Sequence, residues 1–182
     1  MKTNTLEFDA QALREKILDL AMRGKLVPQN PNDEPASVLL EKIKAEKEQL
    51  IKDKKIKKSK PLAPIANDEK PFDIPDNWEW VRLGDVGNYI QRGRSPKYDK
   101  ENKSHPIISQ KCVQWKNISL KDAKFITQEF FDKLEPYRFV KEKDILWNST
   151  GTGTVGRVNI IKKQYDHVPV DSHVTLIRTN LN

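Results

Sequence analysis

The chain has 182 residues, of which 32% are charged and 36% hydrophobic, and it carries a formal net charge of +7. That length allows one ordinary domain, or a small domain with an appendage, and the polar composition indicates that one compact core does not use the whole chain. The basic charge favours an acidic partner, with nucleic acid ahead of an anionic membrane surface. A solvated basic surface accounts for the charge alone equally well.

The composition also excludes several classes of protein. A single cysteine, Cys112, excludes an internal disulfide framework and a zinc site built on cysteines. The N-terminal residues lack the apolar region of a signal peptide, and no apolar run approaches membrane-spanning length. We therefore expect a cytoplasmic protein that does not bind a membrane.

The first predicted element is a helix over roughly residues 10–23. Asp9 suits its N-cap, because a carboxylate there accepts hydrogen bonds from the first free backbone N–H groups. Leu13 and Ile17 lie on one apolar stripe, which must be buried against another surface. Gly24 suits the left-handed position that ends a helix.

A second helix is predicted to begin at Pro35, which suits the first helical position, with Asp33 and Glu34 at the positive end of the helix dipole. Its apolar stripe is narrow, and the other positions between 41 and 58 are mostly Lys and Glu. A narrow stripe with charged flanks favours packing on one partner helix, and a solvent-exposed helix at a domain edge is the alternative. The stripe consists of Leu39, Leu40, Ile43, Leu50 and Ile51.

The composition changes twice between residues 52 and 72. A lysine-rich run over 52–60 is followed by Pro61 and Pro64, a pattern typical of a linker. From Phe72 onward the chain is rich in β-forming, turn and aromatic residues. We therefore predict an α+β protein. Its parts are a two-helix arm over 1–58, a linker over 59–71, and a β-rich domain with a few short helices over 72–182, which is expected to be incomplete.

Within the β-rich part, runs of β-branched and aromatic residues between turn residues predict strands. One short helix is also predicted over 127–134, with Thr127 as its N-cap. The predicted strands are 80–83, 86–90, 106–109, 144–147, 155–161 and 173–178.

The segment 144–158 has the most distinctive pattern, because two β-rich runs flank a turn of Gly, Asn, Ser and Thr. This predicts a strand, a turn and a strand, in which the turn is a binding loop or, as the alternative, a structural hairpin that supports the loop 92–98. Gly151, Gly153 and Gly156 have the spacing of a dinucleotide fingerprint, but that fingerprint must open a helix, and β-branched residues follow here. The glycine-rich hairpin of protein kinases fits locally, yet the other kinase motifs do not occur.

Three polar loops carry the side chains that proteins use to recognise DNA. Arg pairs with guanine and Gln with adenine, while Lys and Ser suit phosphates. Each loop alone is more often an ordinary polar loop, but three of them in one basic domain favour recognition. The candidate DNA-binding residues are Arg92, Arg94, Ser95, Lys97 and Tyr98 in the first loop, Gln110, Lys111 and Gln114 in the second, and Asn148, Ser149, Thr150, Thr152 and Arg157 in the hairpin.

One pattern offers an enzymatic alternative. Asp76 after a proline, followed later by Glu101 and Lys103, matches a loose nuclease pattern in which two carboxylates hold Mg²⁺ and the lysine positions the attacking water. The pattern is weak in a chain this rich in Glu and Lys. A Mg²⁺-dependent nuclease therefore stays an alternative, and a pure assembly scaffold without DNA binding is another.

No catalytic residue or metal ligand is otherwise predicted. The three histidines, His105, His167 and His173, lack ligand spacing and an acidic or cysteine partner at helical offset. Ser149 could form a triad with Asp171 and His173 in principle, but no nucleophile-elbow pattern surrounds it.

Four segments resemble the specificity (S) subunit of type I restriction–modification systems, in that family's order. The third is the usual opening of a target-recognition domain, and the fourth is the hairpin described above. Together they reach from the first helix nearly to the end of the chain. The segments are Leu13-Arg-Glu-Lys-Ile-Leu-Asp-Leu-Ala-Met-Arg-Gly-Lys-Leu-Val-Pro-Gln29, Asn32-Asp-Glu-Pro-Ala-Ser-x-Leu-Leu-x-x-Ile43 with Glu46-Lys-Glu-Gln-Leu50, Ile74-Pro-Asp-Asn-Trp-Glu-Trp-Val-Arg-Leu-Gly84, and Asp144-Ile-Leu-Trp-Asn-Ser-Thr-Gly-Thr-Gly-Thr-Val-Gly-Arg-Val158.

The resemblance implies sequence-specific binding of double-stranded DNA without catalysis. In that family each target-recognition domain reads one half of a split DNA site, and paired helices set the spacing and dock the modification (M) and restriction (R) subunits. The resemblance implies no cofactor in this chain, because S-adenosylmethionine, ATP and Mg²⁺ belong to those partner subunits. The base-contacting residues of the family vary with the target, so the candidate residues above depend on chemistry and loop position alone.

The chain departs from the family's pattern in having one recognition domain and no second copy. This implies either an N-terminal fragment or a half-subunit. A half-subunit would act by pairing, through its helices, with itself or with another S chain.

Overall fold

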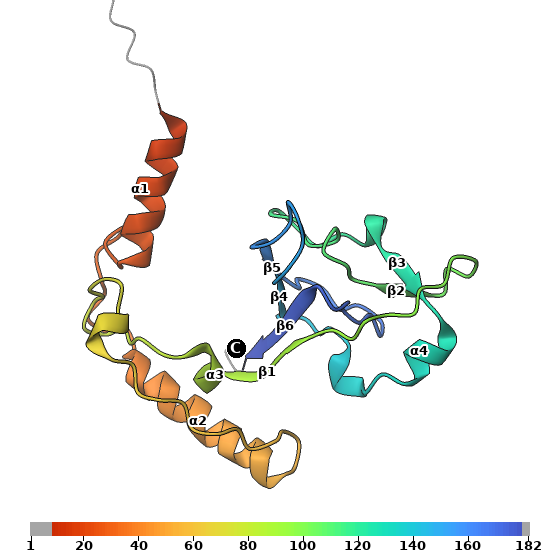
Figure 1. The fold of residues 1–182 in the computed structure, drawn as a ribbon. Coiled ribbons are helices and arrows are strands. Elements are labelled where there is room, and N and C mark those ends of the chain that lie inside the picture. The colour runs from red at the N-terminus through yellow and green to blue at the C-terminus, as the bar shows by residue number, and fades with distance from the viewer. Residues whose placement is uncertain (1–8, 180–182) are drawn as a thin grey trace, which may run out of the picture. The chain divides into compact units, whose positions relative to one another are not determined.

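The computed structural model describes residues 9–179 (Figure 1). The chain divides between Asp85 and Val86 into two compact units, which are described separately below. Helices and antiparallel sheets together make the protein α+β, which confirms the predicted fold class. The predicted arm and recognition domain also include residues 1–8 and 180–182, which lie outside the described residues.

The first unit begins with helix α1 (Ala10–Met22), as the capping pattern predicted. The Asp9 carboxylate accepts hydrogen bonds from the backbone N–H groups of Gln11 and Ala12 at 3.0 and 2.9 Å. Gly24 follows the helix with φ +65°, a conformation that costs glycine little. No residue of α1 is buried.

Helix α2 (Ala36–Lys52) follows, and here the prediction is corrected by one position. Pro35 is the N-cap, not the first helical residue, because its ψ of 146° leaves it extended. Ile43 is the buried residue of this helix, and Leu39 of the predicted stripe stays 42% exposed. The predicted packing of α2 on a partner helix stays a prediction.

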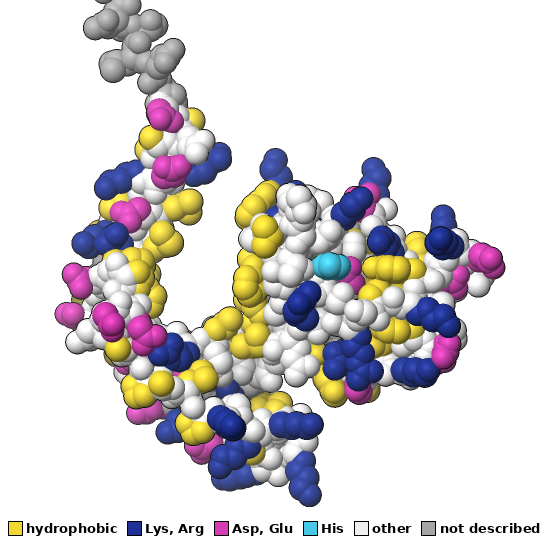
Figure 2. All heavy atoms as spheres, in the orientation of Figure 1, with side chains coloured by type: hydrophobic (Ala, Val, Ile, Leu, Met, Phe, Trp, Pro, Cys, Tyr) yellow, Lys and Arg dark blue, Asp and Glu magenta, His cyan; other side chains and the backbone are white. Residues whose placement is uncertain are grey.

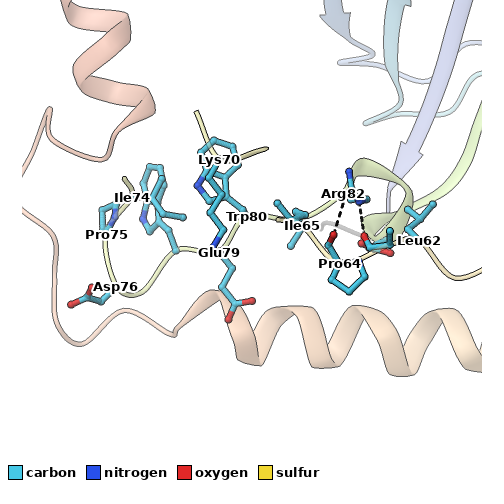
Figure 3. A pocket seen from close by; sticks show the side chains of 14 residues that line it. Leu62, Pro64, Ile65, Lys70, Ile74, Pro75, Asp76, Glu79, Trp80 and Arg82 are labelled. Carbon is cyan, nitrogen blue, oxygen red and sulfur yellow. Dashed lines mark hydrogen bonds between the residues drawn. The ribbon is translucent and has the colours of Figure 1, made fainter. Parts of the chain in front are cut away.

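The side chain of Arg82 holds the segment that follows α2. Arg82 donates hydrogen bonds to the carbonyl of Ala63 at 2.7 Å and to the carboxylate of Glu69 at 2.9 Å. Glu69 belongs to a short 3₁₀ helix, η1 (Asn67–Glu69). The bonds from the Ala66 N–H and from Arg82 lower the pKa of the Glu69 carboxyl. Figure 3 shows the open cavity that these segments line with Leu62, Pro64, Ile65, Ile74, Pro75 and Trp80.

The strand predicted over 80–83 is not formed. Trp80 to Arg82 have no regular secondary structure, and Leu83 opens the short helix α3 (Leu83–Val86). The β-forming residues here line the cavity and bind the preceding segment through the Arg82 side chain, so they do not join a backbone ladder.

The second unit is built on a four-stranded antiparallel sheet with the strand order β1-β6-β4-β5. Two further strands pair with each other in a separate small sheet. The strands are β1 (Gly87–Arg92), β2 (His105–Ile107), β3 (Lys124–Ile126), β4 (Ile145–Asn148), β5 (Val158–Ile160) and β6 (Val174–Thr179).

Short helices connect these strands. Helix α4 (Gln128–Asp132) confirms the predicted helix, and the Thr127 hydroxyl accepts a hydrogen bond from the Phe130 N–H at 3.3 Å, as expected of an N-cap. Two 3₁₀ helices are η2 (Leu120–Asp122) and η3 (Pro136–Arg138).

The remaining predicted strands exist with shifted ends, and β3 was not predicted. The largest shift is at β5, which begins at Val158 and not at Val155. The N–H of Val155 bonds to the carbonyl of Gly151, and the N–H of Gly156 bonds to that of Asn148. Residues 155–157 therefore belong to the turn.

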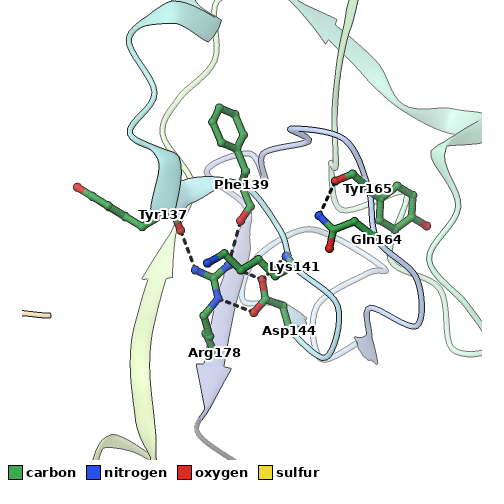
Figure 4. A network of polar contacts seen from close by, with 7 residues as sticks. All are labelled: Tyr137, Phe139, Lys141, Asp144, Gln164, Tyr165 and Arg178. Atoms are coloured by element: carbon green, nitrogen blue, oxygen red, sulfur yellow. Dashed lines mark hydrogen bonds and ion pairs between the residues drawn. The ribbon is translucent and has the colours of Figure 1, made fainter. Parts of the chain in front are cut away.

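The core lies against one face of the larger sheet, where Leu146, Val174 and Leu176 are fully buried. Next to this core, the Arg178 guanidinium of β6 forms a two-point ion pair with Asp144, at 2.8 and 2.6 Å (Figure 4). Asp144 is 1% exposed. Arg178 also donates to the carbonyls of Tyr137 and Phe139, so this one residue fastens β6 to the segment before β4.

Candidate nucleic-acid interface

The predicted hairpin exists, with Trp147 of β4 opposite Val158 of β5. Its turn is held from inside by Asn148, whose amide donates to the carbonyls of Gln110 and Thr154 at 2.9 and 3.2 Å. The Asn148 side chain is fully buried. This predicted DNA-binding residue therefore fixes the shape of the turn, and contact with a ligand is left to its neighbours.

Gly151 lies where two chain segments approach closely. Its φ is +118°, and a Cβ atom at this position would clash with the Gln110 side-chain oxygen. The space in which a ligand was predicted to approach Gly151 is thus filled by the Gln110 side chain of the second loop. Gly153 has φ +71°, and nothing lies within 4 Å of its missing Cβ, so that glycine is required by backbone conformation alone.

This contrast predicts different costs for two substitutions. Gly151→Ala should lower the free energy of unfolding by about 2–4 kcal/mol, because the strained φ and the clash with Gln110 add. Gly153→Ala should cost only about 1–2 kcal/mol, since it retains the conformational term alone. Urea unfolding followed by circular dichroism measures both, and equal costs would mean that the Gln110 contact does not fix the turn.

The first and third predicted loops meet where β1 and β4 end and β6 begins, at one end of the strands. At the end of β1, Arg92 donates to the carbonyl of Ser172 at 2.6 Å and to the hydroxyl of Thr150 at 3.5 Å. The same hydroxyl bonds to His173 Nδ1 at 2.8 Å. Ser149 accepts a hydrogen bond from Thr175 at 2.9 Å. The antiparallel pairing of β6 with β1 and β4 brings these residues together.

His173 lies in the same group of contacts as Arg92 and Thr150, but the sequence did not predict it as a DNA-binding residue. It immediately precedes β6, and its ring contacts the hairpin turn only because β6 pairs with β4. The order of strands in the sheet cannot be read from local sequence, so no local signal identified it. The geometry also excludes the imagined triad, since Ser149 and Asp171 both bond to the backbone of His173 and not to its ring.

The second loop contacts the other side of the hairpin. Arg157 donates to the Gln114 side-chain oxygen at 3.1 Å and to the carbonyl of Gly153 at 3.1 Å. Asn159 of β5 donates to the carbonyl of Gln114 at 2.9 Å. The hairpin is therefore bonded to the second loop on one side and to Arg92 on the other. Lys111 and Thr152 are exposed.

The rest of the first loop has other partners. Arg94 forms an ion pair with Glu135 at 2.8 Å, and Lys97 forms one with Glu129 at 3.2 Å. Hydrogen bonds from Lys133 and Lys97 lower the pKa of Glu129. Lys124 lies over the ring of Tyr98, 4.4 Å from its centroid, and Ser95 is exposed. Arg94 and Lys97 thus carry charges that acidic neighbours already balance.

A buried carboxylate, that of Asp171, lies two residues before His173 in the chain. Asp171 is 2% exposed and accepts a hydrogen bond from the His173 N–H at 2.9 Å. Burial raises the pKa of the Asp171 carboxyl, against the lowering effect of that hydrogen bond. An ionised Asp171 therefore destabilises the folded state, although its oxygen holds the turn before β6.

This predicts a pH-dependent effect of Asp171→Asn. The amide oxygen keeps the acceptor for His173, while the buried charge is removed, so the variant should be more stable than the native protein at pH 7. The difference should shrink as the pH falls through the raised pKa toward the ordinary value of 3.8, because the native carboxyl becomes neutral there. Urea unfolding at pH 7 and pH 4 measures it. Asp171→Ala, which removes the acceptor, should instead cost about 1–3 kcal/mol.

The residues of the nuclease pattern do not form a recognisable metal site. Asp76 belongs to the first unit, whereas Glu101 and Lys103 belong to the second and are exposed. Among residues 9–179 no group of three or more His, Cys, Asp or Glu side chains could hold a metal ion. Within the same residues, no helix has the length and apolar character to cross a membrane.

Comparison with known proteins gives the class. Residues 75–182 match the family model of the type I restriction modification DNA specificity domain, and the chain therefore belongs to that family. The resemblance stated from the sequence is confirmed.

Two relatives from Escherichia coli are specificity subunits. The chain is 58% identical over 86 residues to the type I restriction enzyme EcoAI specificity subunit and 52% identical over 97 residues to the EcoEI specificity subunit. These matches cover 47% and 53% of this chain, but only 15% and 16% of the two relatives.

Proposed function

We propose that this chain is the part of a type I specificity subunit that reads one half of a bipartite DNA target. The observation that carries the proposal is the joining of three chain segments, the end of β1, the loop 110–117 and the hairpin turn, into one polar surface. This surface lies within the part of the chain that matches the DNA specificity domain. We name it the hairpin surface. Its members are Arg92, Lys111, Gln114, Ser149, Thr150, Thr152, Arg157 and His173.

Two arginines of the hairpin surface, Arg92 and Arg157, are placed to bind DNA. A guanidinium carries five N–H donors, and the hydrogen bonds of Arg157 to Gln114 and Gly153 position it without neutralising its charge, because both acceptors are uncharged. The same holds for Arg92, which bonds to a carbonyl and a hydroxyl. A positioned cation with uncharged partners suits a phosphate or the edge of a guanine.

Arg94 and Lys97 differ in that their partners are carboxylates. We therefore give them a smaller part in DNA binding than the sequence alone suggested. Lys and Arg side chains are spread over the visible face of both units (Figure 2), and these contribute to the long-range attraction of DNA.

The second part of the proposal is that the helices of the first unit bind partner subunits. In α1, Leu13, Ile17 and Leu18 are 45%, 43% and 54% exposed, which suits a helix that packs on a partner subunit. We propose that the first unit docks modification and restriction subunits, that the chain itself is not catalytic, and that S-adenosylmethionine, ATP and Mg²⁺ act in those subunits. Self-association through the helices is the proposal for a half-subunit. The proposed site of action is the cytoplasm.

Binding to a random-sequence 30-bp duplex tests the DNA half of the proposal. Fluorescence anisotropy of a labelled duplex should detect binding at 50 mM salt, and affinity should fall steeply by 200 mM, since each neutralised phosphate contributes about −0.9 to the salt slope. Selection from a duplex pool should then give a preferred half-site, with less discrimination than the roughly 10³-fold of a complete site reader. Absence of binding at 50 mM salt would contradict the proposal.

Two further experiments separate the alternatives. Cleavage of plasmid in the presence of Mg²⁺, abolished by Asp76→Ala, would favour the nuclease. A pure scaffold would bind partner subunits after deletion of residues 86–182 and would show no DNA affinity. Replacement of both Leu13 and Ile17 by serine should weaken binding of a purified modification subunit and leave DNA affinity unchanged, because serine changes no charge and these side chains belong to the first unit.

A further inference from the structure

Trp115, in the loop between Cys112 and Ser119, is exposed to an unusual degree. Its 69% exposure is the highest among the large hydrophobic residues that the structure describes. Isolated exposed apolar residues are common on protein surfaces, so exposure alone does not assign a role. The backbone that carries this side chain makes the difference.

That backbone is fixed on both sides of the tryptophan. Val113 and Ile118 form an antiparallel bridge, the N–H of Gln114 bonds to the carbonyl of Asn117 at 3.0 Å, and the N–H of Ser119 bonds to that of Cys112 at 2.9 Å. Cys112 and Val113 are fully buried in the core. The loop is therefore a rigid, anchored turn with the indole at its tip.

Asn159 ties this turn to the hairpin. Its amide donates to the carbonyls of Gln114 and Trp115, at 2.9 and 3.3 Å. The Gln114 side chain accepts a hydrogen bond from Arg157. The backbone of Trp115 and the arginine of the hairpin surface are thus both linked to Gln114, Trp115 as its neighbour in the chain and Arg157 through a hydrogen bond.

The chemistry around the indole favours a nucleobase as its occupant. Lys111 and Lys116, in the same loop, are both exposed, and Arg157 is bonded to the residue before Trp115. A protein partner would have to supply carboxylates for these cations together with an apolar contact for the indole, whereas DNA offers phosphates to the cations and π-faces to the indole.

We propose that Trp115 stacks on a base of the bound DNA, at a step that opens to admit it. A rigid aromatic side chain suits this role because little conformational entropy is lost when it is ordered, and insertion of apolar side chains at a base step is an established way for proteins to unstack DNA. The inference rests on the proposed DNA binding and adds to it an interaction that involves no charge.

Replacing Trp115 by alanine in the full chain tests this. Affinity for the random-sequence 30-bp duplex and for the best duplex selected from the pool should fall by about 5- to 100-fold, the range for removal of one stacked base. The slope of log affinity against log salt should stay unchanged, because the same phosphates are still neutralised. Trp115→Phe should retain most of the affinity, and Trp115→Leu, which keeps apolar area without a π-face, should not.

Trp78→Ala provides the matched control. Trp78 is 40% exposed and belongs to the first unit, so its removal should leave DNA affinity unchanged. Quenching of tryptophan fluorescence on addition of DNA should be largely abolished in Trp115→Phe and retained in Trp78→Phe. Equal DNA affinity of Trp115→Ala and the native chain would overturn the stacking proposal alone, whereas failure of the native chain to bind DNA would overturn the proposed function as well.

Discussion

Replacing Arg178 by methionine should lower the free energy of unfolding by about 3–5 kcal/mol, the cost of leaving a buried charge without its partner. Asp144 is 1% exposed, and Arg178 provides its two-point ion pair. The variant also lacks the hydrogen bonds to the carbonyls of Tyr137 and Phe139. Urea unfolding at pH 7 measures the change.

A double variant shows whether the unpaired charge of Asp144 causes the loss of stability in Arg178→Met. Asp144→Asn together with Arg178→Met removes the buried charge and keeps an acceptor for the Lys141 N–H, which bonds to Asp144 at 2.7 Å. It should recover part of the stability. The matched control is Arg94→Met, which breaks an ion pair of partly exposed side chains and should have little effect. A double variant no more stable than the single one would mean that packing at Arg178 dominates.

Replacing Arg92 and Arg157 together by alanine should weaken DNA binding at least about 30-fold, since removal of a positioned arginine typically costs on the order of 1–3 kcal/mol. Both arginines belong to the hairpin surface, and their hydrogen-bond acceptors there are uncharged. The salt slope should also fall by about 1 for each phosphate that the protein no longer neutralises. Anisotropy titrations at several salt concentrations measure both quantities.

The control for this pair is Arg94→Ala with Lys97→Ala. These residues lie in the same predicted loop as Arg92 and carry the same total charge as the tested pair, but they are paired with Glu135 and Glu129. Their removal frees two carboxylates and should weaken binding less than the removal of Arg92 and Arg157. The opposite order would show that the DNA lies along residues 94–98 and α4, and that the hairpin surface is not the site.

Local signals in the sequence were sufficient wherever an element is stabilised by its own neighbours. Helix α1 was predicted because Asp9 caps it and Gly24 ends it within the same few residues. Helix α4 was predicted from the Thr127 cap for the same reason. The hairpin was predicted because a two-stranded antiparallel pair with a glycine turn is a local structure.

Tertiary contacts decided the features that the sequence pattern misassigned. The run from Trp80 to Arg82 has the composition of a strand, yet Arg82 binds the preceding segment and no neighbouring strand pairs with the run. Strand β3 was missed because it is three residues long and depends on pairing with β2. Strands β2 and β5 are equally short but overlap the longer predicted strands 106–109 and 155–161, whereas Lys124–Ile126 by itself gives too little periodicity to recognise.

The candidate site shows the same division. The sequence by itself determined the family, the basic charge and which loops carry arginine, amide and hydroxyl groups. It could not determine which of these side chains face outward, since burial of Asn148 and pairing of Arg94 with Glu135 depend on residues far along the chain.

Only the tertiary structure placed Arg92, the hairpin turn and His173 together at one end of the strands. The reason is that β6 pairs with both β1 and β4, and such pairing joins residues whose separation in sequence leaves no local pattern. The sequence therefore determined what kinds of chemical group this protein presents, and the order of strands in the sheet decided which of them act together.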